Sequence, residues 1–305
     1  MSSTEKILEI LFPMALGLLF RLIGLFGETE GEMLRKFVVR FTVPVLCFVS
    51  LYAAKAQSVA SILPMAEAFV LMCLVMFAFG WLAALSVKEP AQRTAIHACI
   101  TFGNYGWMGL GVMTALLGAE GTQRVVYFFM LWWPVFYGLG LPIGLIHVGR
   151  STGGVPLGRT VAVAAPPIIA SALGLAANLG HVHVPEHMVS MLAPFGDMTV
   201  PLILLSVGMM LDVTRLRMAL RPALLITAIT LVIGPLVGWG IAALLARDPV
   251  SYQTIILEGA MPVATLTPLL EENYAMDKDL VSTAIVLSTL VSLATIPVLA
   301  AIVIR

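Results

Sequence analysis

Apolar residues run along this chain in stretches of about 20, separated by short polar connections. An α-helix of this length crosses the hydrocarbon core of a bilayer. Because every connection is short, the pattern predicts ten membrane-spanning helices and no soluble domain. Their expected limits are 6–26, 34–53, 60–86, 94–118, 123–147, 159–180, 188–211, 219–246, 251–272 and 279–303.

Two of the ten stretches are interrupted near their middle. The first interruption is Gly103-Asn104-Tyr105-Gly106-Trp107-Met108-Gly109-Leu110-Gly111, and the second is Met261-Pro262-Val263-Ala264-Thr265-Leu266-Thr267-Pro268. In one helix alone, such residues are most often an ordinary kink. Unwound backbone at membrane depth is tolerated only where it is buried in protein or lines a cavity. Because the two interruptions lie 158 residues apart, in corresponding places, they indicate the binding site of a transporter.

The two halves of the chain share further features in the same order. Thr42-Val43-Pro44 recurs as Thr199-Val200-Pro201. The distance from Pro44 to Asn104 is 60 residues, and from Pro201 to Pro262 it is 61. Matching prolines stand in the last helix of each half, at 142 and 297. Three matches at a nearly constant offset indicate an internal duplication. Since five helices is an odd number, the second copy enters the membrane from the opposite side.

We therefore expect an all-α integral membrane protein of ten transmembrane helices, arranged as two inverted five-helix repeats. The repeats would cover 1–148 and 159–305, with a linker at 149–158, and broken helices four and nine would cross. The composition agrees, because 60% of the residues are apolar, 11% are charged and the mean hydropathy is +1.00. No soluble domain hides that much apolar surface, and a net charge of zero gives no indication of nucleic acid.

Lysine and arginine residues are distributed unequally between the two sides of this topology. The positive-inside rule places the richer side in the cytoplasm and both termini outside. The chain is then expected in the plasma membrane, which for a bacterium is the inner membrane. The twelve cations of the richer side are Arg21, Arg35, Lys36, Arg40, Lys88, Arg93, Arg150, Arg159, Arg215, Arg217, Arg221 and Lys278; the other five are Lys6, Lys55, Arg124, Arg247 and Arg305.

The two interruptions supply groups suited to a small anion. If they meet at mid-bilayer, the second half of each broken helix begins there with unpaired N–H groups and a partial positive charge. Thr267 followed by Pro268 is typical of a helix N-cap and first helical position. Asn104 offers a donor and an acceptor beside the bend, where glycines allow a ligand to approach closely. The expected substrate-binding residues are Gly103, Asn104, Gly109, Gly111, Pro262, Thr265 and Pro268.

Ionisable residues inside a membrane are costly and are candidates for function. Glu258 stands four residues before Pro262, and a proline removes the hydrogen bond to the carbonyl four residues back. Its carboxylate and carbonyl could then hold a small cation or a proton, or burial could simply keep the acid neutral. His97, near the cytoplasmic start of its helix, is either a helix-end histidine or a proton-coupling group.

The remaining sequence features give weaker indications of function. His181, His183, Glu186 and His187 resemble metal-ligand spacing, but a flexible polar loop is the preferred interpretation, and no metal or cofactor is expected. Three cysteines in apolar segments are interpreted as packing residues. The N-terminus lacks the basic segment of a cleaved signal peptide. There is no His-Glu-x-x-His, no Gly-x-Ser-x-Gly and no Walker A lysine, so an enzyme or an ATP-driven pump is not expected.

At these residues the chain resembles the auxin efflux carrier family. The matching stretches are Phe102-Gly103-Asn104 through Gly109, Pro201-Leu202 through Leu211, Met261-Pro262, Leu287 through Pro297, and the opening Leu16-Gly17 to Pro44 pattern. The resemblance implies ten helices in inverted repeats, with a substrate site where helices four and nine cross. It also implies a scaffold of helices one, two, six and seven, against which helices 3–5 and 8–10 move. Gly111 stands where many members carry proline.

Glu258-Gly259-Ala260-Met261 also resembles the stretch before the crossing in bile acid–sodium symporters, a related fold. There the glutamate and the neighbouring backbone bind sodium, which implies Glu258 and Met261 as ion-coupling residues here. Pro262 replaces a sodium-binding glutamine of that family.

These observations predict a secondary active transporter of a small organic anion, a carboxylate or an auxin-like weak acid, working by alternating access. Coupling to sodium, coupling to protons and no coupling all remain open, and the scaffold helices would form a homodimer interface. The alternative is an uncoupled channel or sensor for organic anions, although a single pore would not require broken helices in an inverted repeat.

Overall fold

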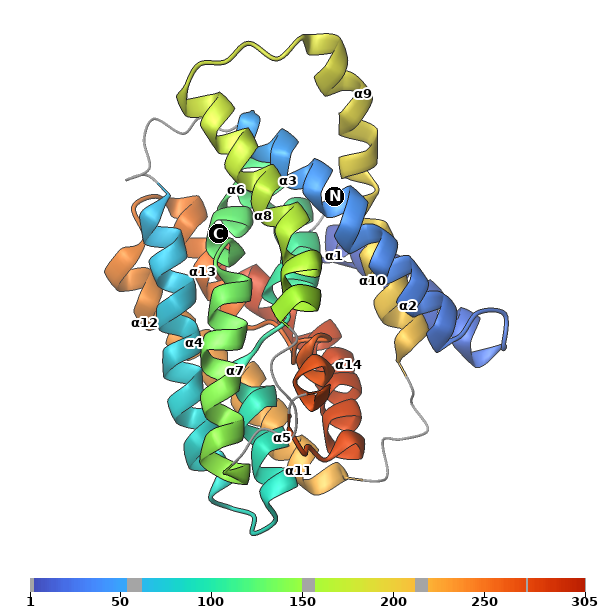
Figure 1. Cartoon of the computed structure of the whole chain (residues 1–305), viewed down its shortest axis with the longest axis vertical. Helices are drawn as coiled ribbons and strands as arrows, with labels where there is room; N and C mark the ends of the chain where they lie inside the picture. Colours follow the sequence, from blue (N-terminus) through green and yellow to red (C-terminus); the bar gives the residue numbers. More distant parts are fainter. Residues whose placement is uncertain (1–2, 54–61, 150–156, 212–218, 273, 305) are drawn as a thin grey trace. The chain divides into compact units, whose positions relative to one another are not determined.

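A computed structural model describes residues 3–53, 62–149, 157–211, 219–272 and 274–304 (Figure 1). Within these residues the chain is helical, apart from turns, short extended segments and one isolated β-bridge. The chain divides into two compact units. Unit 1 comprises Met1–Ala66, Gly106–Met130 and Pro156–Leu211, and unit 2 comprises Glu67–Tyr105, Leu131–Val155 and Asp212–Arg305.

Unit 1 is built from helices of both halves of the chain. Helix α1 packs on α10, and α3 packs on α8 and α9 (Figure 1). The helices are α1 (Ser3–Leu22), α2 (Glu28–Phe37), the π-helix η1 (Val38–Thr42), α3 (Val43–Tyr52), α6 (Leu110–Phe129), α8 (Leu157–Leu179), α9 (Glu186–Asp197) and α10 (Thr199–Met210).

The contact between α1 and α10 depends on two glycines. A Cβ added at Gly17 would lie 2.2 Å from the Leu205 carbonyl oxygen, and a Cβ added at Gly208 would lie 2.0 Å from that of Met14. Small residues let helix backbones approach closely in a membrane, where packing rather than the hydrophobic effect holds helices together. Any larger side chain at either position would force the two helices apart.

The repeated Thr-Val-Pro motif marks the same local irregularity in each half. Proline lacks the N–H that would bond to the carbonyl four residues back, so the helix before it loosens. In the first half the loosened turn is η1, directly before Val43 and Pro44, and in the second half α9 ends at Asp197 and α10 begins at Thr199. The helical stretches themselves run over 28–52 and 186–210, so both limits are offset by 158 residues.

Unit 2 contains the first predicted interruption as far as Tyr105 and the whole of the second. Its helices are α4 (Leu63–Ala84, which begins in unit 1), α5 (Pro90–Thr101), α7 (Trp132–Val148), α11 (Leu220–Ala228), the π-helix η5 (Ile229–Ile233), α12 (Gly234–Leu245), α13 (Pro249–Gly259), the 3-10 helix η6 (Thr267–Glu272) and α14 (Lys278–Val303). The π-helix η3 (Tyr105–Gly109) carries the chain from unit 2 into unit 1.

Five described helical stretches are long and apolar enough to cross a membrane: Leu63–Ala84, Tyr105–Val148, Glu186–Met210, Leu220–Leu245 and Lys278–Val303. Phe12–Leu22 and Ala165–Leu179 are shorter apolar helices. The all-α membrane fold is thus confirmed, whereas the ten-helix inverted repeat is not. Tyr105–Val148 joins parts of two predicted spans, and its helical geometry is interrupted at Gly118 (φ 64°, ψ −150°), the residue at which the first of these spans was expected to end.

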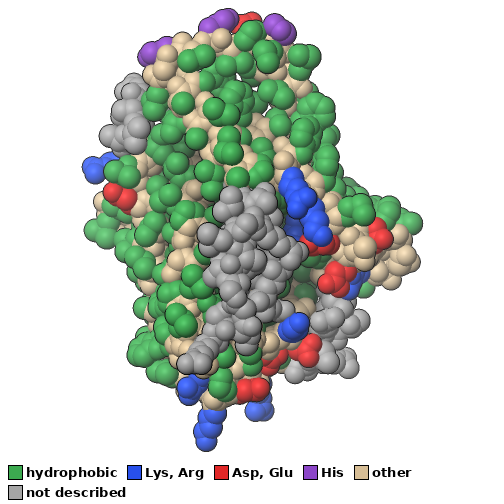
Figure 2. Space-filling view, viewed as in Figure 1, with side chains coloured by type: hydrophobic (Ala, Val, Ile, Leu, Met, Phe, Trp, Pro, Cys, Tyr) green, Lys and Arg blue, Asp and Glu red, His purple; other side chains and the backbone are tan. Residues whose placement is uncertain are grey.

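The surface of the described residues fits a lipid surrounding. On the face drawn in Figure 2, hydrophobic side chains cover most of the surface and charged side chains are few. Large apolar side chains such as Leu244 and Val298 are more than half exposed. A soluble protein rarely exposes such contiguous apolar area. The predicted linker remains undescribed apart from Gly149 and the residues from Leu157 onward, and five of the cations that set the predicted orientation (Lys55, Arg150, Arg215, Arg217 and Arg305) also lie outside the described residues.

Candidate functional site

The two interruptions meet inside unit 2. Helix α5 ends at Thr101 and α13 ends at Gly259, and the extended segments that follow pair with each other. The N–H of Asn104 donates to the carbonyl of Pro262 at 2.7 Å, and the N–H of Ala264 donates to the carbonyl of Phe102 at 2.9 Å. Gly103 and Val263 therefore face each other in an antiparallel β-bridge. We call this pairing of 102–104 with 262–264 the crossing.

Local sequence explains why both chains are extended here. Pro262 cannot donate a backbone hydrogen bond, so α13 cannot continue through it. Gly103 has no side chain, and the Tyr105 ring occupies that space: a Cβ added to Gly103 would lie 2.4 Å from a ring carbon. The bridge satisfies the backbone groups that the broken helices leave unpaired, as a low-dielectric surrounding requires.

The Asn104 side chain is the most informative group at the crossing. It is 1% exposed, and neither its carboxamide oxygen nor its nitrogen has a hydrogen-bond partner among the described residues. A buried polar group left unpaired costs about 1–3 kcal/mol. A buried, unpaired carboxamide beside two broken helices is therefore a group available to a ligand.

The second interruption is held by side chains of its own unit. The N–H of Val263 donates to the hydroxyl of Ser288 on α14 at 3.1 Å. The hydroxyl of Thr267 donates to the carbonyl of Ala264 at 2.8 Å. Thr267 is the first residue of the six-residue helix η6, so the prediction that it caps an α-helix is wrong. A Thr267 hydroxyl that donates to Ala264 does not act as the acceptor that an N-cap provides.

Glu258 is fully buried on α13, one turn before the break. Its two carboxyl oxygens have no hydrogen-bond partner within the described part of the chain. Thr254, one turn earlier on the same face of α13, is also fully buried with its hydroxyl unpartnered there. The Glu258 carbonyl, which we expected to be free, accepts the N–H of Met261 at 3.0 Å, because α13 ends in a tight turn.

The helix that carries Glu258 is fixed by close backbone packing on α12. A Cβ at Gly259 would lie 2.5 Å from the Gly234 carbonyl oxygen, and a Cβ at Gly234 would lie 2.2 Å from that of Gly259. Gly238 continues this contact, since its added Cβ would lie 2.9 Å from the Ile255 carbonyl oxygen. Three glycines thus let α12 and α13 touch along their backbones beside Glu258.

The predicted site residues fall into two groups. Gly103, Asn104 and Pro262 form or flank the bridge, and Met261 and Thr265 adjoin it, all of them buried. Pro268 is exposed. Gly109 and Gly111 belong to unit 1, where an added Cβ at Gly111 would lie 3.2 Å from Leu204 and 3.3 Å from Val200 on α10. Gly111 lies in regular helix and allows close packing of α6 on α10.

His97 has a partner that the sequence analysis missed. It is fully buried on α5, and its Nδ1 lies 2.9 Å from Nε2 of His147, in the last turn of α7. A signal for this pairing existed, because both histidines stand near the ends of adjacent predicted spans that were expected on the same side of the membrane. Ser288 was also missed, since a serine inside an apolar helix has no distinctive spacing.

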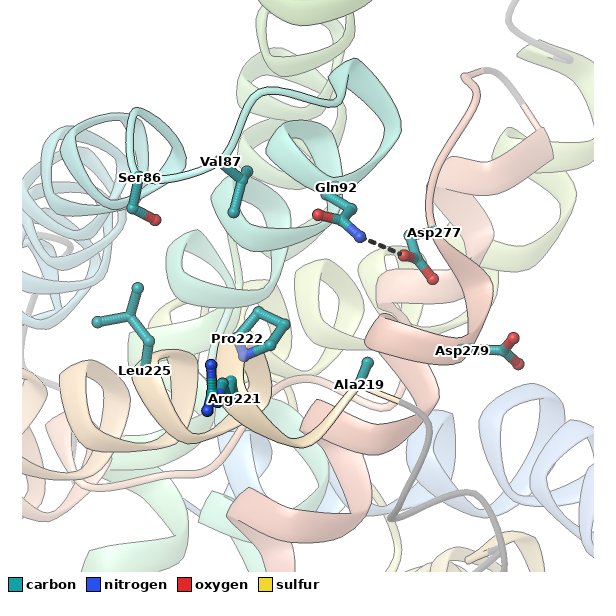
Figure 3. A pocket seen from close by; sticks show the side chains of 9 residues that line it. All are labelled: Ser86, Val87, Gln92, Ala219, Arg221, Pro222, Leu225, Asp277 and Asp279. Atoms are coloured by element: carbon teal, nitrogen blue, oxygen red, sulfur yellow. Dashed lines mark hydrogen bonds between the residues drawn. The ribbon is translucent and has the colours of Figure 1, made fainter.

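A cavity of about 470 Å³ opens elsewhere in unit 2 (Figure 3). Gln92 of α5 donates to Asp277, the N-cap of α14, at 3.3 Å on one side of it, and Arg221 of α11 lies on the other. The remaining lining residues are Ser86, Val87, Ala219, Pro222, Leu225 and Asp279. The lining carries one cation and two carboxylates, and it includes none of the predicted substrate-binding residues.

The histidine-rich loop does not assemble a metal site in the part of the chain that the structure describes. No group of three or more His, Cys, Asp or Glu side chains there could hold a metal ion. His181 adopts a positive φ of 51° in the turn after α8, and His183, Glu186 and His187 are exposed. His181 and His183 thus lie in the polar segment between α8 and α9, and Glu186 and His187 begin α9.

Comparison with known proteins gives the family. A family model described as membrane transport protein matches residues 2–144 and 160–300. An uncharacterized transporter of Methanothermobacter thermautotrophicus is 30% identical over 306 residues, covering 97% of each chain. An uncharacterized transporter of Methanocaldococcus jannaschii is 22% identical over 303 residues, covering 95% of each chain. The chain is thus a multi-pass membrane protein of the membrane transport protein family, the auxin efflux carriers, and it is a transporter rather than an enzyme.

Proposed function

We propose that this protein is a secondary active transporter of a small organic anion, a carboxylate or an auxin-like weak acid. The observation that carries the proposal is Asn104, whose buried carboxamide is unpaired among the described residues and stands at the crossing of two broken helices. The carboxamide N–H groups suit one oxygen of a carboxylate, and its oxygen suits a protonated or hydroxyl group.

The substrate-binding region that we propose is centred on Asn104, with Gly103, Pro262 and Thr265 around it. Gly109, Gly111 and Pro268 remain part of the proposed set, although their described contacts serve other purposes. The predicted substrate-binding residues include no lysine or arginine. A single carboxamide and backbone dipoles fit a monoanion better than a dicarboxylate.

Alternating access is the mechanism that the architecture favours. Helical limits repeat with an offset of 158 residues at 28 and 186, at 52 and 210, and at 101 and 259. This regularity supports the inverted repeat, in which one part of a transporter rocks against another around a central site. We propose that helices one, two, six and seven form the scaffold and the dimer interface, with both termini outside the plasma membrane.

Glu258 is the candidate coupling group. A carboxyl group that is fully buried without a partner holds a proton, or it binds a small cation together with neighbouring oxygens. Met261 adjoins it through the turn that closes on the Glu258 carbonyl. Sodium and protons are both compatible with this arrangement.

Thermal stability of the purified protein across a panel of carboxylates, each with sodium and with potassium, tests the proposal. A ligand that binds the folded state raises the melting temperature. Asn104→Ala should abolish that rise and counterflow in vesicles, while the empty protein gains about 1–3 kcal/mol because an unpaired buried group is removed.

Asn178→Ala is the matched control. The Asn178 carboxamide donates to the Tyr52 carbonyl at 2.7 Å in unit 1, so its loss should destabilise the fold and leave the ligand response unchanged. Wild-type uptake by Asn104→Ala would remove Asn104 from the site. Flux that fails to saturate and shows no counterflow would favour the alternative, an uncoupled channel or sensor.

A further inference from the structure

Two histidines in unit 2 form a direct contact that the transport site does not use. Nδ1 of His97 lies 2.9 Å from Nε2 of His147, and the ring centroids are 5.2 Å apart. Such a contact requires one proton between the two nitrogens, since two lone pairs or two N–H groups would repel. The geometry therefore fixes how many protons the facing nitrogens share.

The pair reaches from a buried position toward the surface. His97 is fully buried, and its Nε2 has no hydrogen-bond partner among the described residues. His147 is partly exposed in the last turn of α7. A proton from water can therefore arrive at the far nitrogen of His147, and the shared proton can move to His97. One added proton converts the neutral contact into a stronger, charge-assisted hydrogen bond, whereas a second would break it.

Among the described residues, no carboxylate forms an ion pair or a hydrogen bond with either histidine. Phe77 of α4 packs against His97 with centroids 4.3 Å apart, and Gly80 of α4 makes room for it, because an added Cβ would lie 2.8 Å from the ring. Arg93 of α5 is the charged group that acts on His147, and its Nε donates to the Val87 carbonyl. The aromatic face of Phe77 can favour a cationic imidazole.

Other helices packed against α5 place their charged groups near its first turn. Helices α7, α11 and α14 contact α5. Arg221 of α11 and Asp277 and Asp279 at the start of α14 line the cavity that also holds Gln92, the third residue of α5 (Figure 3). The titratable group that faces His97 directly is thus His147.

We propose that His97 and His147 together bind one proton, and that this proton is the ion that couples to transport. The inference rests on the proposed transport function and names its coupling ion. The pair joins the end of α7 to α5, and α5 leads directly to the crossing. The His97 carbonyl accepts the hydroxyl of Thr101, the last residue of α5 before the break. Protonation of the pair would therefore set how α5, and with it Asn104, is held.

The first test counts protons without using transport. The chain has five histidines: besides the pair, His181 and His183 lie in the loop between α8 and α9, and His187 lies in the first turn of α9. Nitrogen NMR of histidine-labelled protein should show four of the five imidazoles protonated on acidification, because the pair accepts only one. In His147→Gln, which keeps a hydrogen-bonding group at the Nε2 position, His97 should stay neutral. Protonation of all five, or of only His181, His183 and His187, overturns the proposal.

The second test measures transport in vesicles with an imposed proton gradient. His147→Gln and His97→Asn should lose stimulation by the gradient while keeping counterflow, and His183→Gln in the exposed loop should behave as wild type. Stimulation that persists in both variants rules out the pair as the coupling site. If no organic anion is transported by the wild type, the proposed function fails, and the proton count then stands by itself as a property of the pair. Melting curves of each variant confirm that it is folded.

Discussion

The two interruptions stand at equivalent places in the sequence, yet they differ in structure. The first break resumes as a long helical segment, since the π-helix η3 and then α6, with its kink at Gly118, follow it as far as Phe129. The second resumes only as the six-residue helix η6. The first contains the unpaired carboxamide of Asn104, whereas the second is tied by the Ser288 and Thr267 hydroxyls and follows the buried Glu258.

This difference shows that two copies of a duplicated break can carry different chemical groups. The extended backbone is common to both, because Gly103 and Val263 need each other to pair. The chemistry is not common: the neutral hydrogen-bonding group belongs to the first break, and the ionisable group to the helix before the second. We infer that the first break chiefly recognises the substrate, and that the buried carboxyl group before the second is a separate cation or proton site, distinct from the His97–His147 pair.

Gly103→Val should have the largest effect, because it disrupts the backbone pairing that the two breaks share. Its side chain would collide with the Tyr105 ring, which lies 2.4 Å from the added Cβ. We expect complete loss of transport and of ligand-induced stabilisation. Gly138→Ala is the control, since an added Cβ there has nothing within 4 Å. Normal ligand binding by Gly103→Val would show that the crossing does not form the site.

Glu258→Gln should separate the effect of the ion from the binding of the substrate. The amide keeps the shape of the side chain but carries no charge, so any dependence on sodium should disappear, while stimulation by a proton gradient through His97 and His147 and substrate counterflow persist. The empty protein should also become more stable, because the cost of burying a carboxyl group is reduced. Substrate binding by this variant, measured with and without the ion, tests this expectation. Loss of substrate binding in the absence of any ion would place Glu258 in the substrate site instead.

Ser288→Ala should weaken the second break alone. It leaves the N–H of Val263 unpaired in a buried position, at a cost of about 1–3 kcal/mol. We expect a lower melting temperature and faster hydrogen exchange at Val263, with unchanged affinity for the substrate. Ser292→Ala is a control on the same helix, since the Ser292 hydroxyl donates within α14 to the Thr289 carbonyl. Equal destabilisation by both variants would argue against a special role for Ser288.

Thr267→Val should have the smallest effect. The Ala264 carbonyl that accepts its hydroxyl also accepts the N–H of Thr267 at 3.1 Å, so no group becomes unpaired. We expect a loss of about 0.5 kcal/mol, measured by denaturation in detergent. A loss of about 2 kcal/mol would instead be the value of a lost N-cap and would restore the capping role expected from the sequence.

Much of the fold could be predicted because its determinants are local. Apolar stretches define the membrane helices, and Pro262 and Gly103 mark the ends of extended segments without any knowledge of the partner. The kinks before Pro44 and Pro201 follow from the same rule. The expected limit at 118 coincides with the kink at Gly118, where the backbone leaves the helical conformation.

The candidate site was predictable as a region, but its contacts were not. Asn104 was identified because a polar residue between glycines in an apolar stretch is conspicuous. The contact of His97 with His147 joins residues 50 positions apart, and that of Val263 with Ser288 joins residues 25 apart. Such pairs depend on helix rotation, which hydropathy leaves undefined. The packing of Gly111 against α10 could not be predicted for the same reason.

The bridge between Gly103 and Val263 also constrains how this protein can be made. Its two strands are separated by about 160 residues, so the first half of the chain enters the membrane well before its partner segment exists. At a synthesis rate of about 5–20 residues per second, the Pro262 carbonyl that accepts the Asn104 N–H is synthesised roughly 10–30 s after Asn104. During that interval an unpaired backbone segment at membrane depth must be sheltered by water or by the insertion machinery. Completion of the crossing is therefore a late event of biogenesis, and truncated chains that lack the second half should be recognised as unfinished and degraded.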